Sequence, residues 1–261
     1  WKQSFSRGHV LGPIQQVQPS KKKGTLIRFK PDDEIFGMGA AFKPARLFRM
    51  ARSKAYLFRG VEIKWTCTPE RITDATPAQA LLHFPGGLAD ALADRIGQLD
   101  TVTPTFAGRA ERQGEAGAFE WAVTWSPIGF GESDGFIQSY CNTVSTPDGG
   151  THEAGFRAAL VKGLKAYGEL TNEKRAGIIT AEDVIANAGA LISVFIRNPE
   201  FVGQTKDRLS SPEGQRLTEQ LLRDPFDHWL TESPKQANAL LGFVIDRAED
   251  RLRRRTDKEV Q

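Results

Sequence analysis

The sequence predicts an α+β fold in which at least one pair of strands is parallel. Apolar residues alternate with a period of two in segments 61–67 and 119–125, and they recur at helical spacing in 41–58 and from residue 151 onward. The order strand, helix, strand is the second observation, because it lets two strands of one sheet run in the same direction.

Two domains are predicted, with a boundary at Pro85-Gly86-Gly87, where turn residues coincide with a change of charge. Residues 1–85 contain fifteen Lys or Arg against six Asp or Glu, whereas residues 86–261 contain twenty against twenty-six. The basic first part is consistent with contact with a polyanion. Two solvated surfaces of different composition explain the same split equally well.

The first part is expected to contain strands at 1–5, 26–29 and 61–67 and a helix at 41–58. The strand at 26–29 lies between Gly24-Thr25 and a Pro-Asp-Asp turn. Because the chain begins inside a strand-like run and without Met, we expect a fragment that starts within a domain. Four basic side chains form a drifting stripe on the helix: Lys43, Arg46, Arg49 and Arg52.

The second part is expected to begin with a short helix at 88–99, followed by strands at 119–125 and 136–144. The polar stretch 109–117 is predicted to be a hairpin-like or mobile loop. Trp121 and Trp125 lie four residues apart on one strand, so they share a face and are expected in the core.

A glycine turn at 146–150 precedes a strong helix, which Thr151 is expected to cap. Residues 180–183 resemble a capping box with Asp in place of the usual Glu or Gln. A buried strand at 190–196 and two helices at 211–231 and 234–255 complete the chain. Pro225 should kink or split the first of these helices.

The composition, 39% hydrophobic and 26% charged, is typical of a soluble globular chain. No apolar run approaches the ~20 residues that span a bilayer, and residues 1–23 carry no signal-peptide pattern. Cys67 and Cys141 are expected to be reduced core thiols in a cytoplasmic protein. The four histidines show no metal-ligand spacing, so no metal site is predicted.

The loop Gly203-Gln204-Thr205-Lys206 lies between the apolar strand and a helix start. It offers an amide, a hydroxyl and an ammonium group, a set that suits a small anion such as phosphate. Most exposed loops of this kind are solvated turns, so the loop alone does not establish a phosphate site.

Three segments together are specific for a family. They are Gly-Thr-Leu-Ile-Arg-Phe-Lys-Pro-Asp at 24–32, Thr-Pro-Asp-Gly-Gly-Thr-His-Glu-Ala-Gly-Phe-Arg at 146–157, and Phe-Val-Gly-Gln-Thr-Lys at 201–206. In this order and spacing they closely resemble the ATPase subunit of bacterial type IIA topoisomerases. The flanking segments 139–143 and 206–211 resemble the topoisomerase IV branch more than the gyrase branch.

The resemblance implies an architecture. Residues 1–85 would be the C-terminal portion of a GHKL ATP-binding domain, an α/β sandwich. Residues 86–255 would form a transducer domain similar to the second domain of ribosomal protein S5. Residues 256–261 would lead toward a TOPRIM domain.

The resemblance also implies site residues. Thr25 would belong to the adenine pocket, and Gln204 and Lys206 would lie at the γ-phosphate of ATP. Lys206 would stabilise the charge of the transition state, and its loop would lose its anchor on hydrolysis. The family's magnesium-binding Asn, general-base Glu and glycine-rich lid are missing from this sequence. We therefore expect ATP and Mg²⁺ to be bound in the full-length protein and this chain alone to be inactive.

The implied function is to couple ATP hydrolysis to closure of a DNA gate and to strand passage. The implied partners are the A subunit of topoisomerase IV in an A2B2 complex, a second copy of the B chain when ATP binds, and duplex DNA without sequence preference, with no membrane. The equivalent region of gyrase B and a MutL-like protein are alternatives. A nonenzymatic nucleic-acid-binding module of the ribosomal S5 type is another, but it leaves 204–206 unexplained.

Other polar residues favour structural roles. His152 and Glu153 are adjacent at a helix start, so their side chains should point apart. The run Lys21-Lys22-Lys23 is typical of a solvated loop. The terminal arginines 253–255 differ, because the negative end of a helix dipole and binding of DNA phosphates explain them equally well; any such contact with DNA should be local and weak.

Overall fold

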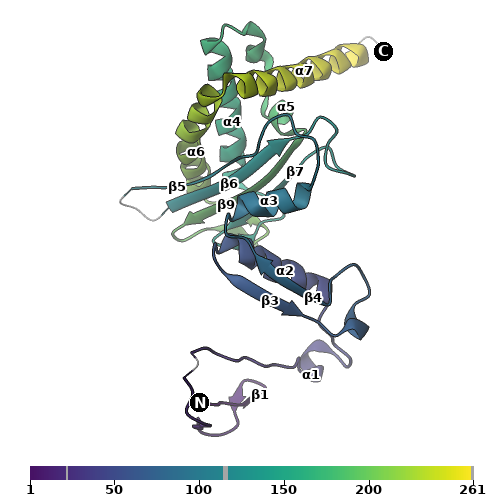
Figure 1. Ribbon diagram of the computed structural model, residues 1–261, viewed down its shortest axis with the longest axis vertical. Coiled ribbons are helices and arrows are strands. Elements are labelled where there is room, and N and C mark those ends of the chain that lie inside the picture. The colour runs from purple at the N-terminus through teal and green to yellow at the C-terminus, as the bar shows by residue number, and fades with distance from the viewer. Residues whose placement is uncertain (22, 114–116, 260–261) are drawn as a thin grey trace.

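Three parts follow one another along the long axis of the molecule (Figure 1): an N-terminal segment, a small layer of one helix and two strands, and a five-stranded sheet covered by helices. The computed structural model describes residues 1–21, 23–113 and 117–259. Lys22 of the basic run, three residues of the predicted 109–117 loop and the last two residues of the chain lie outside this description.

The N-terminal segment contains little regular structure. Its elements are β1 (Phe5–Ser6), β2 (His9–Val10), which pairs with β1 in antiparallel fashion, and α1 (Asp33–Phe36). The predicted strand at 1–5 is therefore reduced to its last residue and a single bridge between Lys2 and Gln15.

The predicted strand at 26–29 is wrong. These residues belong to no strand, and Leu26 and Ile27 are 94% and 77% exposed. A strand persists only where a neighbouring strand takes up its backbone hydrogen bonds, and no strand among the described residues pairs with this stretch. The side chains at 26–29 are of types that favour strands, but the described residues provide no neighbouring strand for them to pair with.

The middle layer confirms the predicted helix and strand. It consists of α2 (Pro44–Leu57), β3 (Glu62–Thr66), a 3₁₀ turn (Pro69–Arg71) and β4 (Gln79–His83). β4 pairs antiparallel with β3 and was not predicted. Lys43, Arg46 and Arg49 of the basic stripe are exposed. Arg52 forms an ion pair with Asp94.

The five-stranded sheet has the order β5-β6-β9-β7-β8. β7 and β9 run parallel, which confirms the predicted parallel pair, and the other neighbours are antiparallel. Residues 109–111 belong to β5 rather than to a loop. The strands are β5 (Phe106–Glu111), β6 (Gly117–Trp125), β7 (Phe136–Cys141), β8 (Val144–Ser145) and β9 (Ala188–Ile196).

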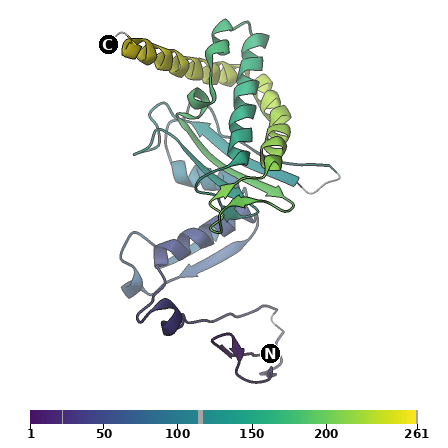
Figure 2. The same cartoon turned by 180° about the vertical axis from the view of Figure 1, so that it is seen from behind.

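Helices cover both faces of this sheet. Figures 1 and 2 show α4 and α6 on one face and α3 on the other, with α7 crossing beyond the end of the sheet. A hairpin of β10 (Phe201–Val202) and β11 (Arg208–Leu209) follows the central strand. The helices are α3 (Leu88–Ile96), α4 (Thr151–Leu170), a 3₁₀ helix (Lys174–Ile178), α5 (Ala181–Ile185), α6 (Pro212–Glu232) and α7 (Pro234–Glu259).

Pro225 does not split α6, which continues to Glu232. Leu222 and Phe226, on either side of the proline, are fully buried. Their packing holds the backbone helical although the proline removes one hydrogen bond. The chain breaks instead at Ser233, immediately before Pro234.

The two faces of the sheet belong to two hydrophobic clusters. Trp121 and Trp125 lie in the cluster that packs against α4 and α6 and are 2% and 0% exposed, which confirms the prediction. The opposite face contributes Ala122, Tyr140 and Leu191 to a second cluster with α3. That cluster also contains Tyr56 and Leu57 of α2, so residues before and after position 85 share one core.

Local features agree in part with the sequence. The Thr180–Asp183 capping box is present, with the Thr180 N–H donating to Asp183 Oδ2 at 2.8 Å. Thr151 is not the cap of α4: Gly150 holds that position, and the Thr151 hydroxyl donates to the Ser211 carbonyl at 2.7 Å. Of the two free thiols, Cys141 is buried but Cys67 is only half-buried.

Among the helices that the structure describes, none has the length and apolarity that crossing a membrane requires.

Candidate functional site: the Lys206 hairpin

The loop that contains Lys206 is the tip of the β10–β11 hairpin. Phe201 pairs with Leu209 and Val202 pairs with Arg208, so the chain turns over residues 203–207. Gly203 has φ +73°, which glycine adopts without steric cost. Gln204, Thr205 and Lys206 are all exposed.

Lys206 is held in an unusual backbone conformation. Its φ is +60°, a left-handed value that costs a residue with a Cβ roughly 1–2 kcal/mol. Such strain clusters at functional sites, where surrounding structure enforces it. The Lys206 Nζ lies 5.8 Å from the centre of the Phe201 ring. Within the described residues its ammonium group has no carboxylate partner, so its charge is available to an anion.

The base of the hairpin is fixed to the glycine turn at 146–150. The Asp148 N–H donates to the Asp207 carbonyl at 2.9 Å, and the Leu209 N–H donates to the Gly149 carbonyl at 3.0 Å. Arg208 Nη1 donates to the Asp148 carbonyl at 3.3 Å. The tip is therefore open to solvent while the base is anchored.

Behind the turn lies a buried polar network that the sequence did not reveal. His152 is fully buried, and its Nε2 is 3.1 Å from the Thr146 hydroxyl. The Thr146 hydroxyl contacts Ser139 Oγ at 2.8 Å, and Ser139 Oγ donates to Glu153 Oε1 at 2.7 Å. His152 and Glu153 are thus joined through two hydroxyls. Ser139 precedes the turn on β7, and no periodic signal links it to Glu153.

Burial determines the protonation of His152. Removal of water disfavours the charged imidazolium, and this lowers the pKa of His152 to about 4. The ring is therefore neutral at physiological pH. It is buried and distant from solvent, which favours the structural role expected from the sequence over acid–base chemistry.

Thr25 is not brought together with Gln204 and Lys206. It is exposed in the N-terminal segment and belongs to no strand. Both views place that segment at one end of the molecule, separated from the five-stranded sheet by α2, β3 and β4 (Figures 1 and 2). Of these three residues, the structure brings together only Gln204 and Lys206.

No group of three or more His, Cys, Asp or Glu side chains that could hold a metal ion occurs in residues 1–21, 23–113 and 117–259.

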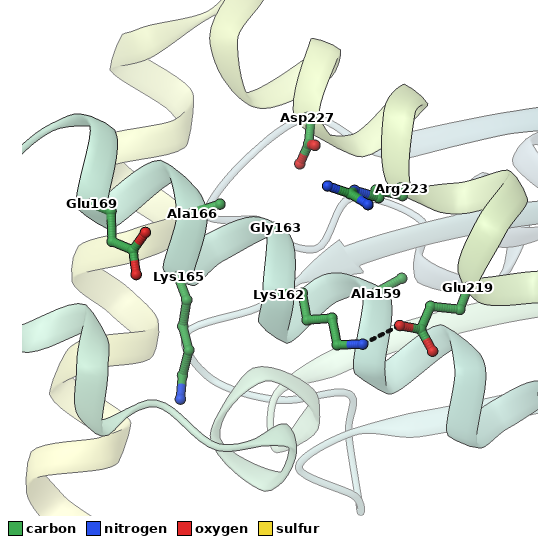
Figure 3. A pocket seen from close by; sticks show the side chains of 9 residues that line it. All are labelled: Ala159, Lys162, Gly163, Lys165, Ala166, Glu169, Glu219, Arg223 and Asp227. Atoms are coloured by element: carbon green, nitrogen blue, oxygen red, sulfur yellow. Dashed lines mark hydrogen bonds and ion pairs between the residues drawn. The ribbon is translucent and has the colours of Figure 1, made fainter.

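Apart from the Lys206 hairpin, a hollow with a volume of about 380 Å³ lies between α4 and α6 (Figure 3). Its floor is formed by small residues, and its rim carries three basic and three acidic side chains, of which Lys162 and Glu219 pair with each other. A lining without net charge does not favour an anion. The residues are Ala159, Lys162, Gly163, Lys165, Ala166, Glu169, Glu219, Arg223 and Asp227.

Comparison with known proteins identifies the family. The sequence profile described as DNA gyrase B matches residues 87–260, more than half of the chain. The chain belongs to the DNA gyrase B family. Within it, the chain is 73% identical over 259 residues to the B subunit of DNA topoisomerase 4 from Caulobacter vibrioides, and 47% identical over 264 residues to that of Bartonella bacilliformis.

These alignments cover 99% and 100% of this chain but only 37% of each relative. The identification from sequence as the ATPase and transducer region of a topoisomerase IV B subunit is confirmed. The chain thus spans a little over a third of the length of these gyrase B family relatives.

Solved structures agree. The ATPase domain of Thermus thermophilus gyrase B, determined with an aminocoumarin, matches with a TM-score of 0.67 and 26% identity over 89% of this chain and 60% of that one. The ATP-binding domain of Francisella tularensis topoisomerase IV also gives 0.67, at 24% identity, over 84% and 57%. The latter likeness supports the fold alone. The predicted α+β class is therefore confirmed.

Proposed function

We propose that this chain couples the phosphate state of bound ATP to movement within a topoisomerase IV B subunit, with the Lys206 hairpin as the contact. In the complete protein, ATP binding would close a gate formed by two B subunits. The A subunit would cleave one duplex in an A2B2 complex, and a second duplex would pass through without being read for sequence. Such work on DNA would take place in the cytoplasm.

One observation carries the proposal: an exposed Lys206 ammonium, with no carboxylate partner among the described residues, stands at the tip of a hairpin whose base is anchored. A fixed point charge beside a terminal phosphate stabilises the negative charge that develops during transfer. Gln204, also exposed at the tip, can donate a second hydrogen bond to a phosphate oxygen. When the phosphate leaves, the tip loses its partner while the base stays in place.

The described residues fit only this end of the nucleotide. Thr25 is exposed in a segment without strand partners, and no metal cluster is present among the described residues. We therefore assign no step to Mg²⁺ and expect this chain alone not to hydrolyse ATP. The finer domain assignment, a GHKL portion in 1–85, a transducer domain similar to ribosomal protein S5 in 86–255 and a linker in 256–261, belongs to the same proposal.

The test is Lys206→Ala in the full-length protein, with Lys235→Ala as the control, because Lys235 is an exposed lysine on another element, α7. Lys206→Ala should abolish ATP hydrolysis while the thermal unfolding midpoint stays unchanged, and the control should retain both. Wild-type turnover in the Lys206 variant would overturn the proposal.

If the chain were instead the equivalent region of gyrase B, the proposed role of Lys206 would be the same, but the reaction of the whole enzyme on DNA would differ. Introduction of negative supercoils by the reconstituted enzyme would assign the chain to that branch, whereas decatenation and relaxation alone support topoisomerase IV. A nonenzymatic nucleic-acid-binding role predicts salt-sensitive DNA binding by this chain, and it gives the Lys206 hairpin no task.

A further inference from the structure

The Lys206 hairpin is hydrogen-bonded to the turn at 146–150, and the Glu153 carboxylate lies close to that turn. Gly149 has φ +68°, and a Cβ at this residue would lie 2.7 Å from the Glu153 carboxyl carbon. The Glu153 carboxylate therefore lies directly against the backbone of the turn. Gly150, with φ +137°, approaches β11 just as closely, because its Cβ would be 2.3 Å from the Leu209 carbonyl oxygen.

Glu153 is itself held from two sides. Ser139 Oγ, on β7, donates to Glu153 Oε1 at 2.7 Å, and Arg157 Nη2, one turn further along α4, lies 3.3 Å from Oε2. The Glu153 side chain is only 15% exposed. Ser139 also contacts the start of the turn, because its Oγ lies 3.1 Å from the Thr146 carbonyl oxygen.

We propose that Glu153, fixed by Ser139, is a positioning residue that holds the 146–150 turn and thereby places Lys206. The connection runs from the sheet through Ser139 to Glu153, from Glu153 to the backbone of Gly149, and from Gly149 to β11. The predicted effect of Glu153 on turnover rests on the proposed role of Lys206. The contacts between the turn and the hairpin can be tested without nucleotide.

Loss of the Glu153 contact should affect turnover of ATP rather than its binding. Glu153 does not touch the tip of the hairpin, so its removal leaves the Lys206 charge in place and moves only its average position. A shift of about 1 Å in a group that stabilises a transition state can lower the rate by about 100-fold. An interaction made chiefly in the transition state is lost from kcat rather than from KM.

The experiment uses the full-length protein with Glu153→Ala, Glu153→Gln and Glu169→Ala. Glu169 is the matched control, because it is an exposed glutamate of the same helix that lines the separate hollow of Figure 3. Glu153→Ala should lower kcat for ATP hydrolysis by about 10- to 100-fold and leave KM within about threefold of wild type. Glu153→Gln keeps an acceptor for Ser139 and should retain most of kcat.

Amide hydrogen exchange supplies a readout that does not depend on ATP. The Asp148 and Leu209 amides both join turn and hairpin. In Glu153→Ala both should exchange at least about tenfold faster, while amides in β9 keep their protection. In Glu153→Gln and Glu169→Ala both should exchange as in wild type.

The outcomes separate the two proposals. Unchanged exchange at Asp148 and Leu209 in Glu153→Ala overturns the positioning role, whatever the turnover. Faster exchange with undiminished kcat also overturns it, provided that Lys206→Ala is inactive. If Lys206→Ala is itself active, the proposed function fails, and the exchange data still decide whether Glu153 holds the hairpin.

Discussion

Glu120 offers the sharpest stability test of how α3 and the end of α2 are held against the five-stranded sheet. It lies on β6, and its side chain is only 2% exposed on the face that packs against α3. Its Oε1 accepts from the Leu88 N–H at 3.0 Å and from Arg59 Nη2 at 2.9 Å. One carboxylate therefore joins the sheet, the first turn of α3 and a residue just after α2. The perturbation is Glu120→Ala.

The magnitude follows from what each partner loses. The Leu88 N–H is buried and would have no acceptor, which costs about 1–3 kcal/mol. The Arg59 side chain is 43% exposed and can turn to water, so its ion pair contributes about 0–1 kcal/mol. Arg109 lies further away at 3.8 Å and keeps its contact with Glu111. Glu120→Ala should thus lower the free energy of unfolding by about 1–4 kcal/mol.

Urea unfolding followed by tryptophan fluorescence measures this change, because Trp121 is the next residue on β6. Glu120→Gln keeps an acceptor for the Leu88 N–H and should lose only about 1 kcal/mol. The control is Glu111→Ala, an exposed partner of Arg109, which should lose less than about 0.5 kcal/mol. Equal losses in Glu120→Ala and Glu120→Gln would refute the reasoning, since the charge and not the hydrogen bond would then dominate.

Three further predictions concern buried groups. The pKa of His152 is lowered from 6.5 to about 4, so between these pH values the unfolded chain binds a proton at His152 and the folded chain does not. The free energy of unfolding should therefore fall by about 3 kcal/mol as pH drops from 6.5 to 4. A His152→Asn variant should show a smaller dependence of this free energy on pH in urea titrations. Gly155→Ala should lose about 1–3 kcal/mol in thermal melts, because its Cβ would lie 2.4 Å from a backbone carbonyl of α6, whereas Gly177→Ala, which meets open space, should be neutral. Burial raises the pKa of Cys141 to about 12, so a thiol reagent at pH 8 should modify only Cys67 in the folded protein and both cysteines in urea.

The sequence was informative where structure is local. The helix at 44–57 and the alternating strand at 117–125 were predictable because amphipathic periodicity is written into consecutive residues. The prediction of a strand at 26–29 was wrong, and β4 was not predicted. Both errors arise because a strand forms only with a partner strand, which the local sequence pattern does not reveal. Pro225 does not split α6 for a related reason: the packing of its neighbours outweighs its local preference.

The site shows the same division. Residues 203–206 predicted an anion-binding loop, and residues 146–150 predicted a turn, because each feature lies within one short segment. The link between them did not follow from sequence, since Ser139 and Glu153 meet only after β7 and α4 have packed. Thr25 could be assigned by resemblance but not positioned, because its segment takes no part in a sheet.

β7 connects the two regions on which the proposed coupling depends. Ser139 and Tyr140 are consecutive, so the pleat directs them to opposite faces of the sheet. Ser139 binds Glu153 behind the Lys206 hairpin, while the Tyr140 hydroxyl contacts the Tyr56 hydroxyl of α2. β7 is also paired in parallel to the central strand β9 along its whole length. β7 therefore connects the turn that anchors the Lys206 hairpin, through Ser139, with α2 of the basic N-terminal part, through Tyr140.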